Sequence, residues 1–86
     1  MTSADWTLHR PLLTETLNAF YASGLTHHDR RQVHEWLMEA CVDPAAIGRP
    51  DPEVDGLWFG RVKETAVGVI YSIDRQQMKV FVAVIR

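Results

Sequence analysis

Residues 57–86 read LWFGRVKETAVGVIYSIDRQQMKVFVAVIR, and this stretch decides the fold. It contains three runs rich in β-branched and aromatic residues, at 57–63, 66–73 and 78–85. The polar pair Glu64-Thr65 separates the first two runs, and the polar tetrapeptide 74–77 separates the second from the third. Short polar connections between such runs are typical of antiparallel hairpins. We therefore predict a three-stranded antiparallel meander over residues 57–86.

The middle strand of this meander has two weakly polar faces. Alternate residues share a face, so one face carries Val67, Val69, Tyr71 and Ile73, and the other carries Ala66, Gly68, Ile70 and Ser72. Strands that are apolar or small on both sides are covered on much of both sides. One face can therefore receive helices, and the other is either partly exposed or contacts a partner.

Residues 11–42 show the periodicity of a helix hairpin. Pro11 suits a first helical turn, Leu13, Leu17 and Phe20 fall on one helix face, and Gly24 marks the end of the helix. A second apolar stripe follows at Val33, Trp36, Leu37, Ala40 and Cys41. Two helices that are joined by so short a turn lie roughly antiparallel.

The ends of the second helix also carry signals. Thr26 followed by Asp29 resembles a capping box, and Asp43-Pro44 closes the helix because the residue before proline avoids helical geometry. Residues 43–56 are rich in proline and acidic residues and are predicted to be a connecting loop, while residues 6–9 favour a short first strand. The prediction is a single α+β domain over residues 1–86, a helix hairpin on a small antiparallel sheet in the order (β)ααβββ.

The composition indicates a globular cytoplasmic protein. Hydrophobic residues make up 47% of the chain, but no run of eighteen apolar residues is present, and the first six residues lack the pattern of a secretory signal. A single cysteine, Cys41, cannot form an internal disulfide. No glycine-rich phosphate loop or zinc-ligand spacing appears, so neither a cofactor, a metal nor a membrane is expected.

The net charge of −2 is divided unevenly along the chain. Residues 1–56 contain four basic and nine acidic residues, a net of −5, whereas residues 57–86 contain five basic and two acidic residues, a net of +3. A basic sheet can meet an anionic partner locally although the whole chain is acidic.

The meander carries short motifs in a fixed order, namely Gly56-Leu57-Trp58, Arg61-Val62 and VIYSID at 69–74. These motifs resemble the RelE/ParE superfamily of bacterial toxins, which typically reads Gly-Leu-Trp, then Arg-Val, then Tyr-Arg-Val-Ile-Tyr-x-Ile-Asp. The third strand and the second helix with its Asp43-Pro44 end are similar to the family as well. The resemblance covers roughly residues 26–86.

The resemblance implies a toxin of a type II toxin–antitoxin module. By family analogy its activity is that of a metal-independent mRNA endoribonuclease or, in the ParE branch, that of an inhibitor of DNA gyrase. The implied partners are a cognate antitoxin and either RNA with the ribosome or gyrase.

The candidate catalytic residues are basic, because RNA cleavage needs a cation beside the developing negative charge. Arg61 matches the family pattern, and Lys63 shares its face in the predicted strand 57–63. By the resemblance, Arg86 is a remnant of the family's basic tail. Trp58, Phe59 and Lys79 are the candidate partner-binding residues. An exposed aromatic ring beside Arg61 suits stacking on a base or gripping a peptide.

Two departures from the family favour a second hypothesis. Gly68 stands where the family places its phosphate-contacting arginine, and the chain ends at Arg86, directly after the third strand. The alternative is a catalytically degenerate RelE/ParE-fold module that acts by binding another protein or by forming a homodimer.

Overall fold

The computed structural model describes residues 6–86 and confirms an α+β arrangement. The elements in chain order are β1 (Thr7–Leu8), α1 (Arg10–Tyr21), α2 (His27–Ala40), β2 (Gly48–Pro50), β3 (Trp58–Arg61), β4 (Gly68–Asp74) and β5 (Lys79–Ile85). The prediction that a secretory signal is absent rests mainly on residues 1–5, which lie outside the described residues. Within residues 6–86, no helix has the length and apolarity needed to cross a membrane.

The sheet is larger than predicted. It has five strands in the order β1-β5-β4-β3-β2, and the meander forms its centre. The strand β2 arises within residues 43–56, the predicted loop, and pairs antiparallel with β3. The strand β2 is only three residues long and ends in Pro50, so it is too short to show an alternation of apolar and polar residues in the sequence. Because β1 runs parallel to β5, the sheet is mixed rather than purely antiparallel.

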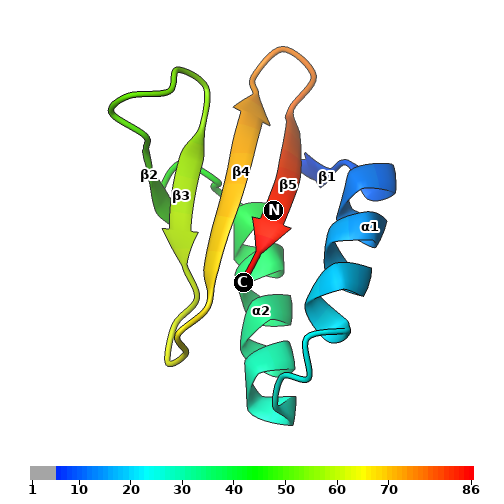
Figure 1. The fold of residues 1–86 in the computed structure, drawn as a ribbon. Coiled ribbons are helices and arrows are strands. Elements are labelled where there is room, and N and C mark those ends of the chain that lie inside the picture. Colours follow the sequence, from blue (N-terminus) through cyan, green and yellow to red (C-terminus); the bar gives the residue numbers. More distant parts are fainter. Residues whose placement is uncertain (1–5) are drawn as a thin grey trace.

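Both helices lie against the same face of the sheet (Figure 1). The helix hairpin connects β1 at one edge of the sheet to β2 at the other edge. Among residues 6–86, no helix lies against the opposite face, which we call the open face (Figure 1). The meander's outer strand β3 pairs with β2 at Trp58, Phe59 and Gly60, whereas β1 pairs only with Lys79 and Val80 of β5.

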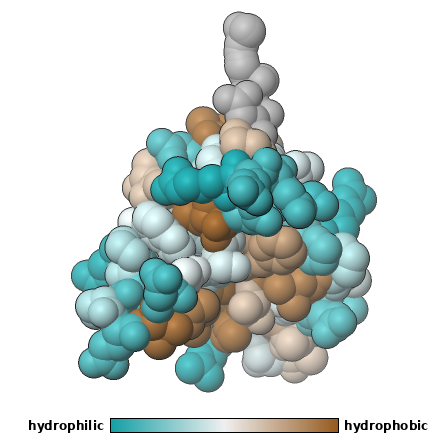
Figure 2. All heavy atoms as spheres, turned by 90° about the horizontal axis from the view of Figure 1, so that it is seen from above, coloured by the Kyte–Doolittle hydropathy of each residue, from teal (hydrophilic) through white to brown (hydrophobic). Residues whose placement is uncertain are grey.

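The end of the molecule that carries the β4–β5 turn is mixed in polarity. Seen from above, its hydrophobic side chains form separate patches between hydrophilic ones (Figure 2). Asp74 organises this turn by accepting backbone N–H bonds from Gln76 and Gln77 at 3.0 and 3.1 Å. This end therefore does not present one continuous apolar surface.

The helix signals are confirmed at the start of α2 and in the turn that precedes it. The Thr26 hydroxyl accepts a hydrogen bond from the Asp29 backbone N–H at 3.2 Å, which satisfies one of the free donors of the first turn. Gly24, between the helices, has a φ of +76°, a conformation that glycine adopts without strain. These two residues allow α2 to begin soon after α1 ends.

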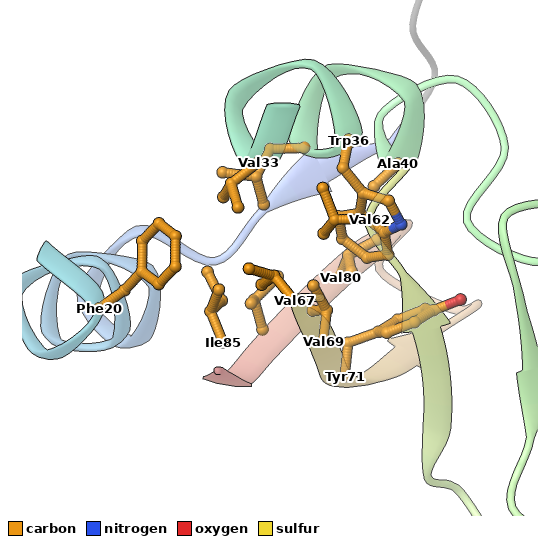
Figure 3. Close-up of a cluster of buried hydrophobic side chains, with 12 residues drawn as sticks. Phe20, Val33, Trp36, Ala40, Val62, Val67, Val69, Tyr71, Val80 and Ile85 are labelled. Atoms are coloured by element: carbon orange, nitrogen blue, oxygen red, sulfur yellow. The ribbon is translucent and has the colours of Figure 1, made fainter. Parts of the chain in front are cut away.

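The core lies between the helices and the sheet (Figure 3). Its buried members are Phe20, Val33, Trp36, Leu37, Ala40, Val62, Val67, Val69, Tyr71, Val80, Val82 and Ile85. The predicted alternation of the middle strand is confirmed, since Val67, Val69 and Tyr71 all point into this core. The Tyr71 hydroxyl donates a 2.8 Å hydrogen bond to the Pro44 carbonyl and ties β4 to the loop after α2.

One irregularity in β5 sets the direction of its last residues. Ile70 lies opposite Val84 and Tyr71 lies opposite Val82, so Ala83 is an extra residue without a partner. After such a β-bulge, each residue of the strand points to the face opposite to the one that regular alternation would give it. Ile85 consequently enters the core near Phe20 (Figure 3). Val84 lies opposite Ile70, and Arg86 exchanges backbone hydrogen bonds with Gly68, so the residues on either side of Ile85 turn to the open face.

Candidate functional site

Two rows of residues cross the open face. In the first row Arg49 lies opposite Phe59, Phe59 lies opposite Ile70, and Ile70 lies opposite Val84. Directly opposed residues of antiparallel strands project from the same face of the sheet. This row therefore joins four strands through one cation and three apolar side chains.

The second row places one arginine on each side of a glycine. Arg61 lies opposite Gly68 in the register of β3 and β4. On the other side, Gly68 and Arg86 exchange backbone hydrogen bonds of 2.8 and 3.0 Å. Arg61 and Arg86 therefore project from the same face, from the two backbone positions that flank Gly68.

This arrangement encloses a hollow of about 230 Å³, which we call the Gly68 hollow. Phe59, Ala66, Gly68, Ile70 and Val84 line it together with Arg61 and Arg86. Both arginines are exposed. The hollow thus has an apolar floor and two permanently charged guanidinium groups at its sides.

A second hollow of about 500 Å³ adjoins the first and is named here the Arg49 hollow. It is lined by Ile47, Gly48, Arg49, Phe59 and Arg61. Phe59 and Arg61 line both hollows, so the two depressions are neighbours on one surface. The open face therefore presents Arg49, Arg61 and Arg86 around a central phenylalanine.

The chemistry that fits this surface is the binding of phosphate. Arginine presents a planar fork of donors that matches phosphate oxygens, and guanidinium groups hold their charge at all accessible pH values. The residues that line the Gly68 hollow supply two such groups. A guanidinium is too weak an acid to serve as a general acid or, once charged, as a general base near pH 7. The hollow is therefore suited to binding a phosphodiester rather than to transferring protons during its cleavage.

Lys63, the third candidate catalytic residue, lies elsewhere. β3 ends at Arg61, so Lys63 belongs to the turn that leads into β4 and strand alternation does not extend to it. It lines a separate cleft of about 210 Å³ against α2, in which Glu35 and Glu39 are also found. Arg61 borders both this cleft and the Gly68 hollow. The structure thus brings Arg61 together with Arg86 on the open face.

The three candidate partner-binding residues also separate. Trp58 turns to the helix side and packs beside Tyr71, with ring centroids 6.2 Å apart. Phe59 projects from the open face and is 41% exposed. Lys79 lies opposite Asp74, at the far end of β4 from Gly68. Six residues of extended strand put about 20 Å between these two positions.

The groups with shifted pKa values lie outside the open face. Burial, and to a smaller extent the charge of Asp43, raises the pKa of Tyr71 to about 12. Burial also raises the pKa of Cys41, which borders a hollow beside α1 and β1. Both groups are therefore neutral at physiological pH, and neither adds charge to the site.

Sequence reasoning did not identify Arg49 as a site residue. It sits in the stretch predicted as a loop, and only its pairing with Phe59 carries it to the open face. The one available signal is the short Gly48-Arg49-Pro50 segment, because proline is tolerated in edge strands. Arg86, by contrast, was predicted as a site residue, but its position beside Arg61 depends on the bulge at Ala83.

Comparison of the chain with models of known protein families gives no match, and comparison with curated proteins gives none.

Proposed function

We propose that this protein is a toxin of the RelE/ParE type that acts by binding RNA on the open face of its sheet. The observation that carries the proposal is the pairing of Arg61 and Arg86 across Gly68. A phosphodiester in the Gly68 hollow can receive donors from both guanidinium groups at once. The motif resemblance at 56–74 supports the toxin assignment, and the helix hairpin on one side of an antiparallel meander is compatible with it.

The proposal assigns binding, rather than rapid cleavage, to this chain. Cleavage through the 2′-hydroxyl requires a base, an acid and a cation near the phosphorane. Arg61 and Arg86 supply the cations of the Gly68 hollow, and the other side chains that line it are apolar. Arrest of growth then follows from occupation of RNA that is needed for translation, and a cognate antitoxin would act by covering the open face.

The test combines growth with binding. Induced expression in bacteria should stop growth, and Arg61→Ala or Arg86→Ala should relieve the arrest at equal soluble protein levels. Arg75→Ala is the matched control, since Arg75 is an exposed arginine in the β4–β5 turn. Purified protein should bind a labelled single-stranded RNA, and each open-face substitution should weaken binding. Continued growth at confirmed expression, together with no RNA binding, would refute the proposal.

A second function is favoured by the row Phe59–Ile70–Val84, which is apolar and crosses three strands. Such a row can receive an apolar partner segment, so the alternative is a protein-binding module of the same fold, including a module that binds its own copy. Salt separates the two functions, because binding through phosphate contacts weakens steeply as salt rises and apolar contacts do not. A partner or dimer that persists at high salt favours this second function.

A further inference from the structure

Phe59 occupies the centre of the open face. It borders the Gly68 hollow and the Arg49 hollow, and it also borders a third depression of about 210 Å³ towards Pro50, Leu57 and Ile70. A bound linear ligand that crosses this face from Arg86 to Arg49 must therefore pass over or beside the Phe59 ring. The position of this ring controls what the three hollows can accept.

Gly68 determines how the Phe59 ring lies. A methyl group built at Gly68 would come within 3.1 Å of Cζ and 3.2 Å of Cε1 of Phe59. The outer end of the ring therefore rests against the Gly68 backbone, in the space that any larger residue would occupy. With the ring held down on the neighbouring strand, 41% of Phe59 remains exposed to solvent. An aromatic residue of this exposure, supported from below by backbone, is a preformed platform.

The charges around the ring define the class of molecule that fits it. Arg61 borders the depressions on two sides of Phe59, and Arg49 lies opposite Phe59 on β2. Arg86 follows the last residue of β5 and lies beyond Gly68. An aromatic face with cations on several sides matches a nucleic acid strand, in which π-faced bases alternate with phosphates. A base that is paired within a duplex has both faces occupied by its neighbours and cannot stack on a side chain.

We propose that Phe59 is a stacking platform for an unpaired base of single-stranded RNA, whose adjoining phosphates contact Arg61 and Arg86. This inference rests on the proposed function, because it specifies which form of RNA the same site accepts. Phe59 and Gly68 together act as specificity-determining residues: Gly68 leaves room for the ring, and the ring selects strands whose bases are free. The arginines supply affinity for the backbone without regard to base pairing.

The experiment measures binding of a fluorescein-labelled ten-nucleotide RNA of mixed sequence, as a single strand and as a duplex with its complement. Anisotropy titrations at several salt concentrations compare the unaltered protein with Phe59→Ala, Phe59→Leu, Phe59→Trp and Arg61→Ala. Loss of one stacked base should weaken single-strand binding about 5- to 100-fold in Phe59→Ala and Phe59→Leu. Phe59→Trp should retain the affinity, and the duplex should bind the unaltered protein more weakly than the single strand.

The salt dependence separates stacking from charge. The slope of log affinity against log salt should be unchanged in the Phe59 variants and should fall by about 0.7 in Arg61→Ala. The Phe59→Trp variant gives a further readout that does not depend on the truncated variants folding. Its added indole should be quenched by the single strand beyond the quenching seen in the unaltered protein.

The outcomes distinguish this inference from the proposed function. Single-strand binding that Phe59→Leu leaves intact, or equal binding of strand and duplex, would overturn the stacking platform while leaving RNA binding in place. An intact affinity in Phe59→Leu would show that the ring is only an apolar contact. Absence of binding to either RNA form would overturn the proposed function and the platform with it.

Discussion

The Thr16 hydroxyl donates a 2.9 Å hydrogen bond to the Val82 carbonyl at the point where β5 carries one residue more than β4. The same hydroxyl lies 3.2 Å from the Ala83 carbonyl. A bulge removes backbone groups from the ladder of the sheet, and buried groups without partners are costly. A side chain of α1 therefore compensates the irregularity that turns Arg86 to the open face.

Replacement of Thr16 by valine should destabilise the fold. The substitution keeps the shape of the buried side chain and removes its only donor, so the Val82 carbonyl loses the hydrogen bond from Thr16. The expected loss in free energy of unfolding is about 1–3 kcal/mol. Urea denaturation measures it, with Thr14→Val on the exposed side of the same helix as the control. Equal stability of the two variants would show that the bulge does not need the Thr16 hydroxyl.

Two glycines of the sheet should differ in how much stability they lose on replacement by alanine. At Gly60 the added methyl would lie 2.6 Å from Cζ2 of the buried Trp36 and 3.2 Å from the Ile47 carbonyl. Overpacking of this kind costs about 1–3 kcal/mol. At Gly68 the close contacts of the methyl, at 3.1 and 3.2 Å, are with the exposed ring of Phe59, which can move outward, and the Gly60 carbonyl lies at an ordinary contact distance of 3.7 Å. The midpoint temperature of thermal unfolding should therefore fall markedly for Gly60→Ala and little for Gly68→Ala. The reverse order would contradict the assignment of Gly60 to the helix side and of Gly68 to the open face.

Stability should decline in alkaline solution because of Tyr71. Its pKa is raised to about 12 in the folded protein, against about 10 in an unfolded chain. The unfolded state therefore releases its proton first, and stability is lost as the pH rises from about 10 to about 12, by up to about 2–3 kcal/mol. Below pH 10 both states are protonated and the group has no effect on the pH dependence.

The control for this pH dependence is Tyr71→Phe, which removes the titrating hydroxyl. At neutral pH this variant should be about 1–3 kcal/mol less stable, because the buried Pro44 carbonyl loses its donor. The gap between the two proteins should then narrow above pH 10. A gap of constant size in denaturation experiments at pH 8 and pH 11 would contradict the prediction.

The N-terminal cap of α2 should be separable from the site. Thr26→Ala removes the acceptor of the Asp29 backbone N–H and should cost about 0.5–2 kcal/mol in stability. Thr26→Ser keeps a hydroxyl in the same place and should recover most of the loss. Neither change should alter RNA affinity at a temperature where both variants are folded, and a loss of affinity would indicate that α2 takes part in binding.

Much of the fold follows from local patterns in the sequence. Apolar residues at helical spacing, Thr26 and Gly24 define the helix hairpin, and alternation over residues 57–86 defines the meander. Each of these signals lies within a few turns or one hairpin, where the residues that interact are close along the chain. The division of Trp58 and Phe59 between two faces follows from the same alternation, although alternation does not say which ring faces the helices.

Other features depend on residues that are distant in the sequence. The pairing of Arg49 with Phe59, the alignment of β1 beside β5 and the hydrogen bond from Thr16 to Val82 each join segments that no local pattern connects. The candidate site shows this most clearly. The sequence by itself determined that Phe59 and Arg61 stand on alternate positions of one strand, and so on one face, beside a strand that contains Gly68. Only the tertiary structure decided that Arg86 joins them, because one extra residue at Ala83 reverses the faces of β5, and a threonine from α1 satisfies the backbone at that position.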